Sequence, residues 1–84
     1  MLDQSVFVEI MEGLSNIEQD GAVPKNVRIK VKTAMDILSN ESEANVNMRI
    51  DRSLQELGEI AEDPNLESHT RMQIWSVVSR LESK

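Results

Sequence analysis

The basic run "KNVRIKVK" contains the side chains of this chain that are best suited to bind a ligand. Lys25, Arg28 and Lys32 fall in it without an intervening acid, whereas residues 1–24 carry five acids and no base. Ammonium and guanidinium groups donate charge-assisted hydrogen bonds to carboxylates and phosphates. These three bases are therefore a candidate anion patch, aided by the N-terminus of the helix that they begin. The alternative is that they pair with acids of the preceding helix: Glu9, Glu12 and Glu18.

Catalytic chemistry has few candidate residues here. His69 is the only histidine and cysteine is absent, so a two-histidine or thiolate metal site is impossible within one chain. The Glu-x-x-His pair of carboxylate metal sites in helix bundles also fails, because Leu66 stands three residues before His69. We therefore expect a protein that is not an enzyme and holds no metal or cofactor. Four acids are expected to form a solvated helix face: Glu56, Glu59, Glu62 and Asp63.

Net charge narrows the class of protein further. Nine Lys and Arg stand against fifteen Asp and Glu, a formal charge of −6, which disfavours binding to nucleic-acid phosphates. The N-terminus has no basic segment ahead of an apolar one, and no apolar run approaches the ~20 residues of a membrane span. We expect a cytoplasmic protein that binds neither nucleic acid nor membranes.

Apolar residues recur every three or four positions along the whole chain, which is the period of an amphipathic α-helix. Gly21 ends the first helix, Pro24 suits the first turn of the second, and Pro64 cannot continue the third. No segment alternates as a strand would, so the sequence predicts an all-α fold. The expected helices lie near residues 4–19, 24–39, 43–62 and 67–82.

The two halves of the chain repeat each other at a spacing of 43 residues. Laying residues 6–40 over 49–83 aligns the apolar positions of both helices and of their turn. The same register places Arg28 on Arg71. Agreement across two helices and a turn favours a structural duplication over two unrelated amphipathic hairpins.

The repeat also predicts how the helices are arranged. Two-helix units of this period are typical of HEAT-like arrays, but two units are fewer than such an array needs. We therefore predict a single domain, 1–84, in which two similar hairpins close as an antiparallel four-helix bundle. The first hairpin covers about 4–40 and the second about 43–83.

The C-terminal half is similar to a known family. Its stretch "EDPNLESHTRMQIWSVVSRLE" resembles the signature of uncharacterised protein family 0147, a group of small acidic archaeal proteins, and "VPKNVR" resembles that family's Val-Pro-x-x-x-Arg stretch. Glu67 departs from the pattern, since members tend to place a second proline there. The resemblance covers about residues 6–82 and implies an all-helical fold with no known activity. The residues that carry it are Val23, Pro24, Arg28, Asp63, Pro64, Asn65, His69, Thr70, Arg71, Ile74, Trp75, Val78, Ser79, Leu81 and Glu82.

The fourth predicted helix carries large apolar side chains outside its buried stripe. At about 100° per residue, Trp75 lies about 100° and Met72 about 160° from Ile74, which is in the stripe. The equivalent positions of the first hairpin are Lys32 and Ile29, so the position of Trp75 tolerates a charge. We therefore expect an interaction module, a homodimer or the binder of another protein, whose interface holds Trp75 and Met72, with Ile29 as a further candidate.

Two alternatives stay open at this point. Trp75 can instead pack along a neighbouring helix at the edge of the bundle, with no part in association. The protein can instead be a small-ligand or anion-binding protein that uses Lys25, Arg28 and Lys32.

Overall fold

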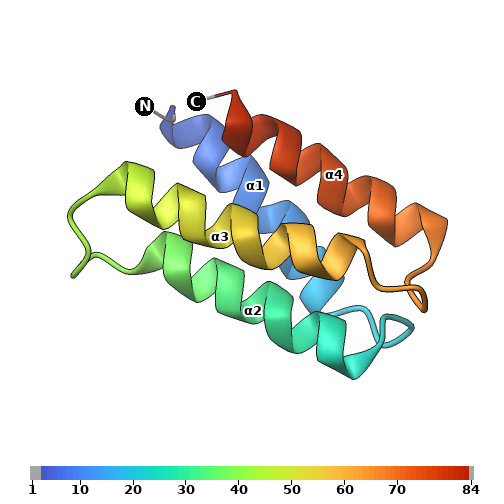
Figure 1. The fold of residues 1–84 in the computed structure, drawn as a ribbon. Coiled ribbons are helices and arrows are strands. Elements are labelled where there is room, and N and C mark those ends of the chain that lie inside the picture. The colour runs from blue at the N-terminus through green and yellow to red at the C-terminus, as the bar shows by residue number, and fades with distance from the viewer. Residues whose placement is uncertain (1–2, 84) are drawn as a thin grey trace.

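The computed structural model describes residues 3–83 and consists of four α-helices joined by short turns (Figure 1). Within that range there is no strand and 75% of the residues are helical, which confirms the predicted all-α class. The helices are α1 (Gln4–Glu18), α2 (Lys25–Ser39), α3 (Val46–Ala61) and α4 (Ser68–Glu82).

Three helices begin later than the sequence pattern predicts, α3 by three residues and α2 and α4 by one each. α3 begins at Val46 rather than near residue 43, because the Asn45 side chain accepts a hydrogen bond from Met48 N–H at 3.2 Å and so acts as the N-cap. The backbone N–H of Asn45 in turn donates to the Glu43 side chain at 3.1 Å, which keeps this segment in a turn. Pro24, expected in the first turn of α2, stands just before it.

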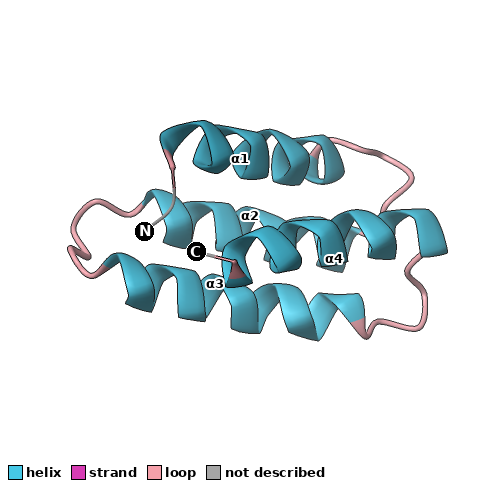
Figure 2. Cartoon of the chain, turned by 90° about the horizontal axis from the view of Figure 1, so that it is seen from above, coloured by secondary structure: helices cyan, strands magenta, loops and turns pink. Residues whose placement is uncertain are grey.

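The helices form a closed ring. α1 packs on α2, α2 on α3 and α3 on α4, and α4 returns to α1, while the backbones of the diagonal pairs stay apart (Figures 1 and 2). In a stacked array the first and last helices would not meet, so the α1–α4 contact makes this an antiparallel bundle. The start of α1 and the end of α4 lie at the same end of the molecule, where Glu9 and Arg80 form an ion pair.

The core is built from equivalent positions of the two hairpins. Leu14 and Leu57 are both 0% exposed, and so are Val31 and Ile74, with 43 residues between the members of each pair. Burial of each such side chain contributes roughly 1.5–3 kcal/mol relative to exposure. The pairs buried in both hairpins are Ile10–Ser53, Leu14–Leu57, Ile17–Ile60, Val23–Leu66, Val27–Thr70, Val31–Ile74, Ala34–Val77 and Leu38–Leu81.

The turns within the two hairpins repeat the same hydrogen bonds. Asp20 Oδ1 accepts from Ala22 N–H at 2.9 Å, and Asp63 Oδ1 accepts from Asn65 N–H at 2.8 Å. The main-chain oxygen of each aspartate also accepts from the amide three residues further on, at 3.1 Å in both turns. An aspartate side chain thus orders each turn in the same way, and burial and turn geometry both follow the spacing of 43 residues.

Gly58 is a position where the fold can be stabilised. It lies inside α3, and a Cβ added to it would meet nothing within 4 Å. Because glycine in a helix interior costs about 1 kcal/mol relative to alanine, Gly58→Ala should stabilise the domain by about that amount. Thermal unfolding followed by circular dichroism should show Tm rising by roughly 4–8 °C.

Gly13→Ala is the companion variant. Its added Cβ would lie 3.6 Å from Val77 Cγ2, an ordinary contact, so a similar gain is expected. A fall in Tm for Gly58→Ala alone would mean that the space beside α3 is occupied in solution.

Candidate functional site

The three bases of the predicted anion patch meet in one open depression on α2. Lys25, Arg28 and Lys32 line it together with Ile29 and Glu18, and its volume is about 200 Å³. The bases share one face because residues three and four apart on a helix are neighbours. Glu18 comes from the last turn of α1. The structure therefore brings together all three predicted residues of the patch.

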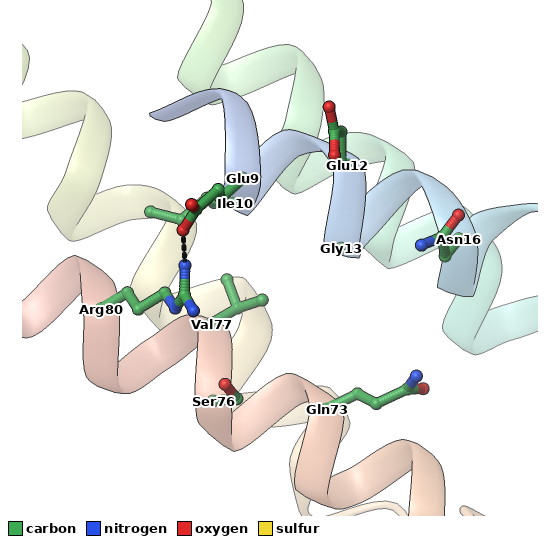
Figure 3. Close-up of a pocket in the computed structure, with 9 residues that line it drawn as sticks. All are labelled: Glu9, Ile10, Glu12, Gly13, Asn16, Gln73, Ser76, Val77 and Arg80. Carbon is green, nitrogen blue, oxygen red and sulfur yellow. Dashed lines mark hydrogen bonds and ion pairs between the residues drawn. The ribbon is translucent and has the colours of Figure 1, made fainter. Parts of the chain in front are cut away.

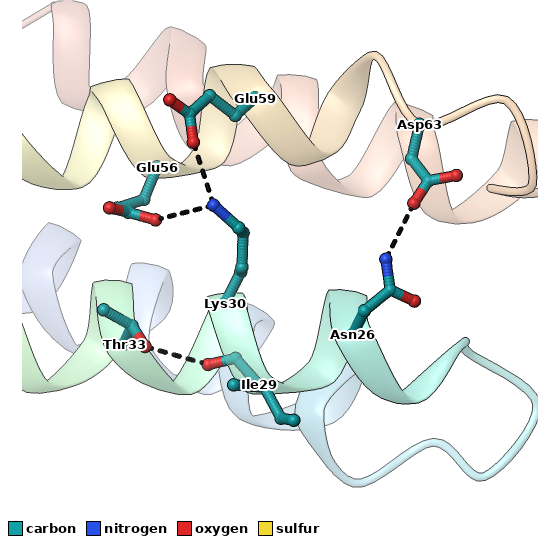
Figure 4. A network of polar contacts seen from close by, with 7 residues as sticks. All are labelled: Asn26, Ile29, Lys30, Thr33, Glu56, Glu59 and Asp63. Carbon is teal, nitrogen blue, oxygen red and sulfur yellow. Dashed lines mark hydrogen bonds and ion pairs between the residues drawn. The ribbon is translucent and has the colours of Figure 1, made fainter.

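Lys30, the fourth base of the same run, faces another helix. Its Nζ lies 2.9 Å from Glu59 Oε2 and 3.5 Å from Glu56 Oε2, both on α3 (Figure 4). The hydrogen bond to Glu59 and the charge of Glu56 raise the pKa of Lys30 above its ordinary value of 10.5. The acidic face of α3 is thus not only solvated, as the sequence predicts, but also binds α2.

The anion patch itself makes no ion pair within residues 3–83. Of the acids that the sequence alternative assigned to these bases, Glu9 pairs with Arg80 of α4. Glu18 lines the depression without forming an ion pair. The positive charges of the patch are therefore left without a fixed counter-charge.

The equivalent arginines of the two hairpins differ in their contacts. Arg71 donates from Nε to the main-chain oxygen of Ala61 at 2.9 Å and from Nη2 to that of Asp63 at 2.8 Å. It thereby fixes the start of α4 to the end of α3. Arg28 makes no equivalent bond to the end of α1, and its Nε is buried without a hydrogen-bond partner. The first hairpin thus leaves its arginine beside the depression.

A groove between α1 and α4 is a second hollow, which the sequence does not predict (Figure 3). It has a volume of about 420 Å³, and Glu9 pairs with Arg80 across it. Only the closure of the bundle creates this groove, and no motif in either helix marks it. Its lining residues are Glu9, Ile10, Glu12, Gly13 and Asn16 of α1 with Gln73, Ser76, Val77 and Arg80 of α4.

The three residues of the predicted interface lie on two helices. Trp75 and Met72, on α4, are 48% and 71% exposed. Ile29 is 56% exposed, but it belongs to the depression on α2 and points away from α3 (Figure 4). Because α2 and α4 are diagonal in the ring, the structure groups Trp75 with Met72 and separates Ile29 from both.

Other kinds of site find little support in residues 3–83. No three His, Asp or Glu side chains in that range are placed to hold a metal ion. His69 is exposed in the first turn of α4. Within the same range no helix has both the length and the apolar character needed to cross a membrane.

Two similar hairpins closed into a ring, with a basic depression on one helix and an exposed apolar pair on another, define a small all-α bundle. The chain belongs to the uncharacterised protein family UPF0147, whose sequence profile matches residues 1–83. This confirms the resemblance seen in the C-terminal hairpin. The family description assigns no function.

Relatives of this chain are archaeal proteins. A UPF0147 protein of Methanosarcina mazei is 42% identical over 78 residues, 93% of this chain and 83% of its own. One from Thermoplasma volcanium is 39% identical over 82 residues, 98% of this chain and 91% of its own. The crystal structure of a family member from Thermoplasma acidophilum matches with a TM-score of 0.91 at 38% identity, covering 96% of this chain and 94% of that one. These similarities confirm the helical fold.

Asp63 connects the turn of the second hairpin to α2. Its Oδ1 accepts from Asn65 N–H at 2.8 Å and its Oδ2 from the Asn26 side chain at 3.0 Å (Figure 4). The bond from Asn65, and then that from Asn26, lowers the pKa of Asp63 below its ordinary value of 3.8. A carboxylate with a lowered native pKa stabilises the fold above its unfolded-state pKa, and this contribution is lost as pH falls through the native value.

Asp63→Asn should therefore flatten the acid dependence of stability. In the wild type, protonation of the Asp63 carboxylate below pH 3.8 reduces the free energy of unfolding. Asparagine carries no charge and takes up no proton, so the variant has no such loss. Urea unfolding at neutral pH and at steps down to about pH 2 measures the difference. The stability gap between the two proteins should narrow as pH falls. A gap that stays constant down to the lowest pH would show that the charge of Asp63 does not stabilise the fold.

Proposed function

We propose that this protein is a non-enzymatic interaction module of the cytoplasm that associates with a second copy of itself through α4. The proposal rests on one observation, the exposure of Trp75 and Met72, three residues apart on one helix. Large apolar side chains are usually buried in the core of a protein. The chain has one tryptophan and one phenylalanine in all. A surface that presents the single tryptophan is well suited to protein contact.

The apolar pair is a property of the second hairpin and not of the repeat. In the first hairpin the position of Trp75 is Lys32 and that of Met72 is Ile29. The fold therefore forms with a charge at one of these two positions. An indole at such a position is better explained by a contact outside the monomer than by the demands of the core.

Association of two identical copies suits the surroundings of this pair. Ser68 stands one turn before Met72, and Ser79 one turn after Trp75, and both serines are exposed. Each copy has a net charge of −6. Because serines flank the Met72–Trp75 pair along α4, two copies can pack these faces together without placing acidic side chains opposite each other at the centre of the interface. A two-fold axis through this face would place each indole against α4 of the other copy.

Trp75→Ala should convert the dimer to a monomer of 9.5 kDa without loss of helix, because the truncated side chain lies outside the core. Light scattering coupled to size-exclusion chromatography measures the mass, and circular dichroism measures the helix content. Ile29→Ala is the matched control. It shortens an exposed apolar side chain at the position equivalent to Met72, on a helix that the proposed interface does not include.

Other outcomes would count against the homodimer. An unchanged mass with a stability loss of about 3–5 kcal/mol for Trp75→Ala would assign Trp75 to the packing of the monomer. A wild-type protein that is monomeric at every concentration tested would exclude self-association. In that case native mass spectrometry of protein purified from its own source would show whether another protein is bound.

A further inference from the structure

We propose that the depression on α2 is a binding site for a small phosphate-bearing anion, held by Lys25, Arg28 and Lys32. This site is separate from the α4 face, so its existence does not depend on self-association. Three observations carry the inference. First, Arg28 does not make the main-chain hydrogen bonds that Arg71 makes in the second hairpin. Second, the three bases of the patch form no ion pair within residues 3–83. Third, the hollow has room for a small ligand.

The comparison of the two hairpins identifies Arg28 as the group available for binding. The repeat places Arg28 where Arg71 stands, and Arg71 uses its guanidinium to hold two main-chain oxygens at the end of α3. The same oxygens exist at the end of α1, yet Arg28 bonds to neither and keeps a buried Nε without a partner. Arg28 is therefore free of the main-chain contacts that hold Arg71, and its guanidinium is available to a ligand in the depression that it lines.

Arg49 shows that a buried Nε does not by itself mark a site. Its Nε is also without a partner, but its Nη1 donates to the main-chain oxygen of Leu38 at 3.2 Å, which fixes the guanidinium in the fold. Arg28 has no such bond, and it lines the depression where Lys25 and Lys32 also stand. The combination of an unfixed guanidinium with two lysines that lack ion pairs is found at this depression.

Charge and shape point to phosphate. Three cationic side chains face one acid, Glu18, so the depression keeps a positive balance on a protein of net charge −6. Lysines bind phosphate as point charges and an arginine adds a planar pair of donors. Pro24 caps α2 without a side-chain hydrogen bond, so the first-turn N–H groups next to Lys25 lack a side-chain acceptor.

The hollow is large enough for a compact phosphate. Its volume of about 200 Å³ is that of roughly six or seven water molecules in the liquid, which admits orthophosphate, pyrophosphate or a small phosphate monoester. The carboxylate of Glu18 would repel an extended polyanion that covered the whole depression. Nucleic acid, whose phosphates are diesters along a long chain, is therefore disfavoured, and a compact dianion is favoured.

Titration of the isotope-labelled full chain with sodium phosphate and with pyrophosphate, at fixed ionic strength, tests the site. The backbone amide resonances of Lys25, Asn26 and Val27 should shift and saturate, with a dissociation constant of about 1 mM or tighter. Arg28→Gln and Lys32→Gln should each weaken binding by about tenfold or more, since each removes a charge-assisted hydrogen bond.

Lys30→Gln is the matched control for charge. It removes one positive charge from the same helix, but Lys30 is engaged by Glu56 and Glu59 of α3 and does not line the depression. Its effect on affinity should stay below about twofold, because salt screens a charge outside the site. An equal loss for Lys30→Gln and Arg28→Gln would overturn the proposal in favour of diffuse charge attraction.

The stability of the ligand-free protein gives a second, independent test of whether Arg28 has a structural role. In phosphate-free buffer Arg71→Gln should lower Tm by about 4–8 °C, because it removes two hydrogen bonds, whereas Arg28→Gln should leave Tm unchanged or higher. Equal losses would mean that Arg28 fixes the end of α1 in solution and is not free to bind. Failure of phosphate to saturate, or tighter binding of a DNA oligonucleotide than of pyrophosphate, would also overturn the proposal.

Discussion

Each hairpin of this chain has an apolar face that only the other hairpin covers, and the rest of the structure depends on this mutual burial. In a domain of 84 residues the gain from burial barely exceeds the entropy lost on ordering the chain. The fully buried positions, such as Leu14 and Leu57, are therefore the ones at which the hairpins agree. Polar contacts such as those of Lys30 with α3 fix which surfaces meet, and they add little to the free energy of folding.

The differences between the hairpins lie on the surface, and both proposals arise from them. Where the second hairpin uses Arg71 to fix a turn, the first leaves Arg28 beside an open depression. Where the first has Lys32, the second has Trp75. A duplicated fold can alter such positions without loss of its core, because the core residues are carried by other faces of the same helices. The repeat thus serves as an internal reference that separates structural residues from candidate binding residues.

Local periodicity is what made much of this structure predictable. The four helices, the buried stripe and the exposure of Trp75 follow from spacing along the chain, and the anion patch follows from three bases on one helical face. Features that depend on two distant segments did not follow. The pairing of Lys30 with Glu59, the release of Arg28 and the groove between α1 and α4 appear only once the helices pack. The late start of α3 was missed because several residues near Asn45 could serve as caps.

The ion pair between Glu9 and Arg80 places the first turns of α1 beside the last turns of α4. A short peptide linker could therefore join the two ends of the bundle, and a new break in the segment between α2 and α3 would leave every helix in place. The circularly permuted chain would run from the second hairpin to the first. Because the two hairpins bury equivalent positions, the permuted chain would bury the same side chains. The bundle is defined by the pairing of two similar halves, in the way that a dimer is, although one chain carries both.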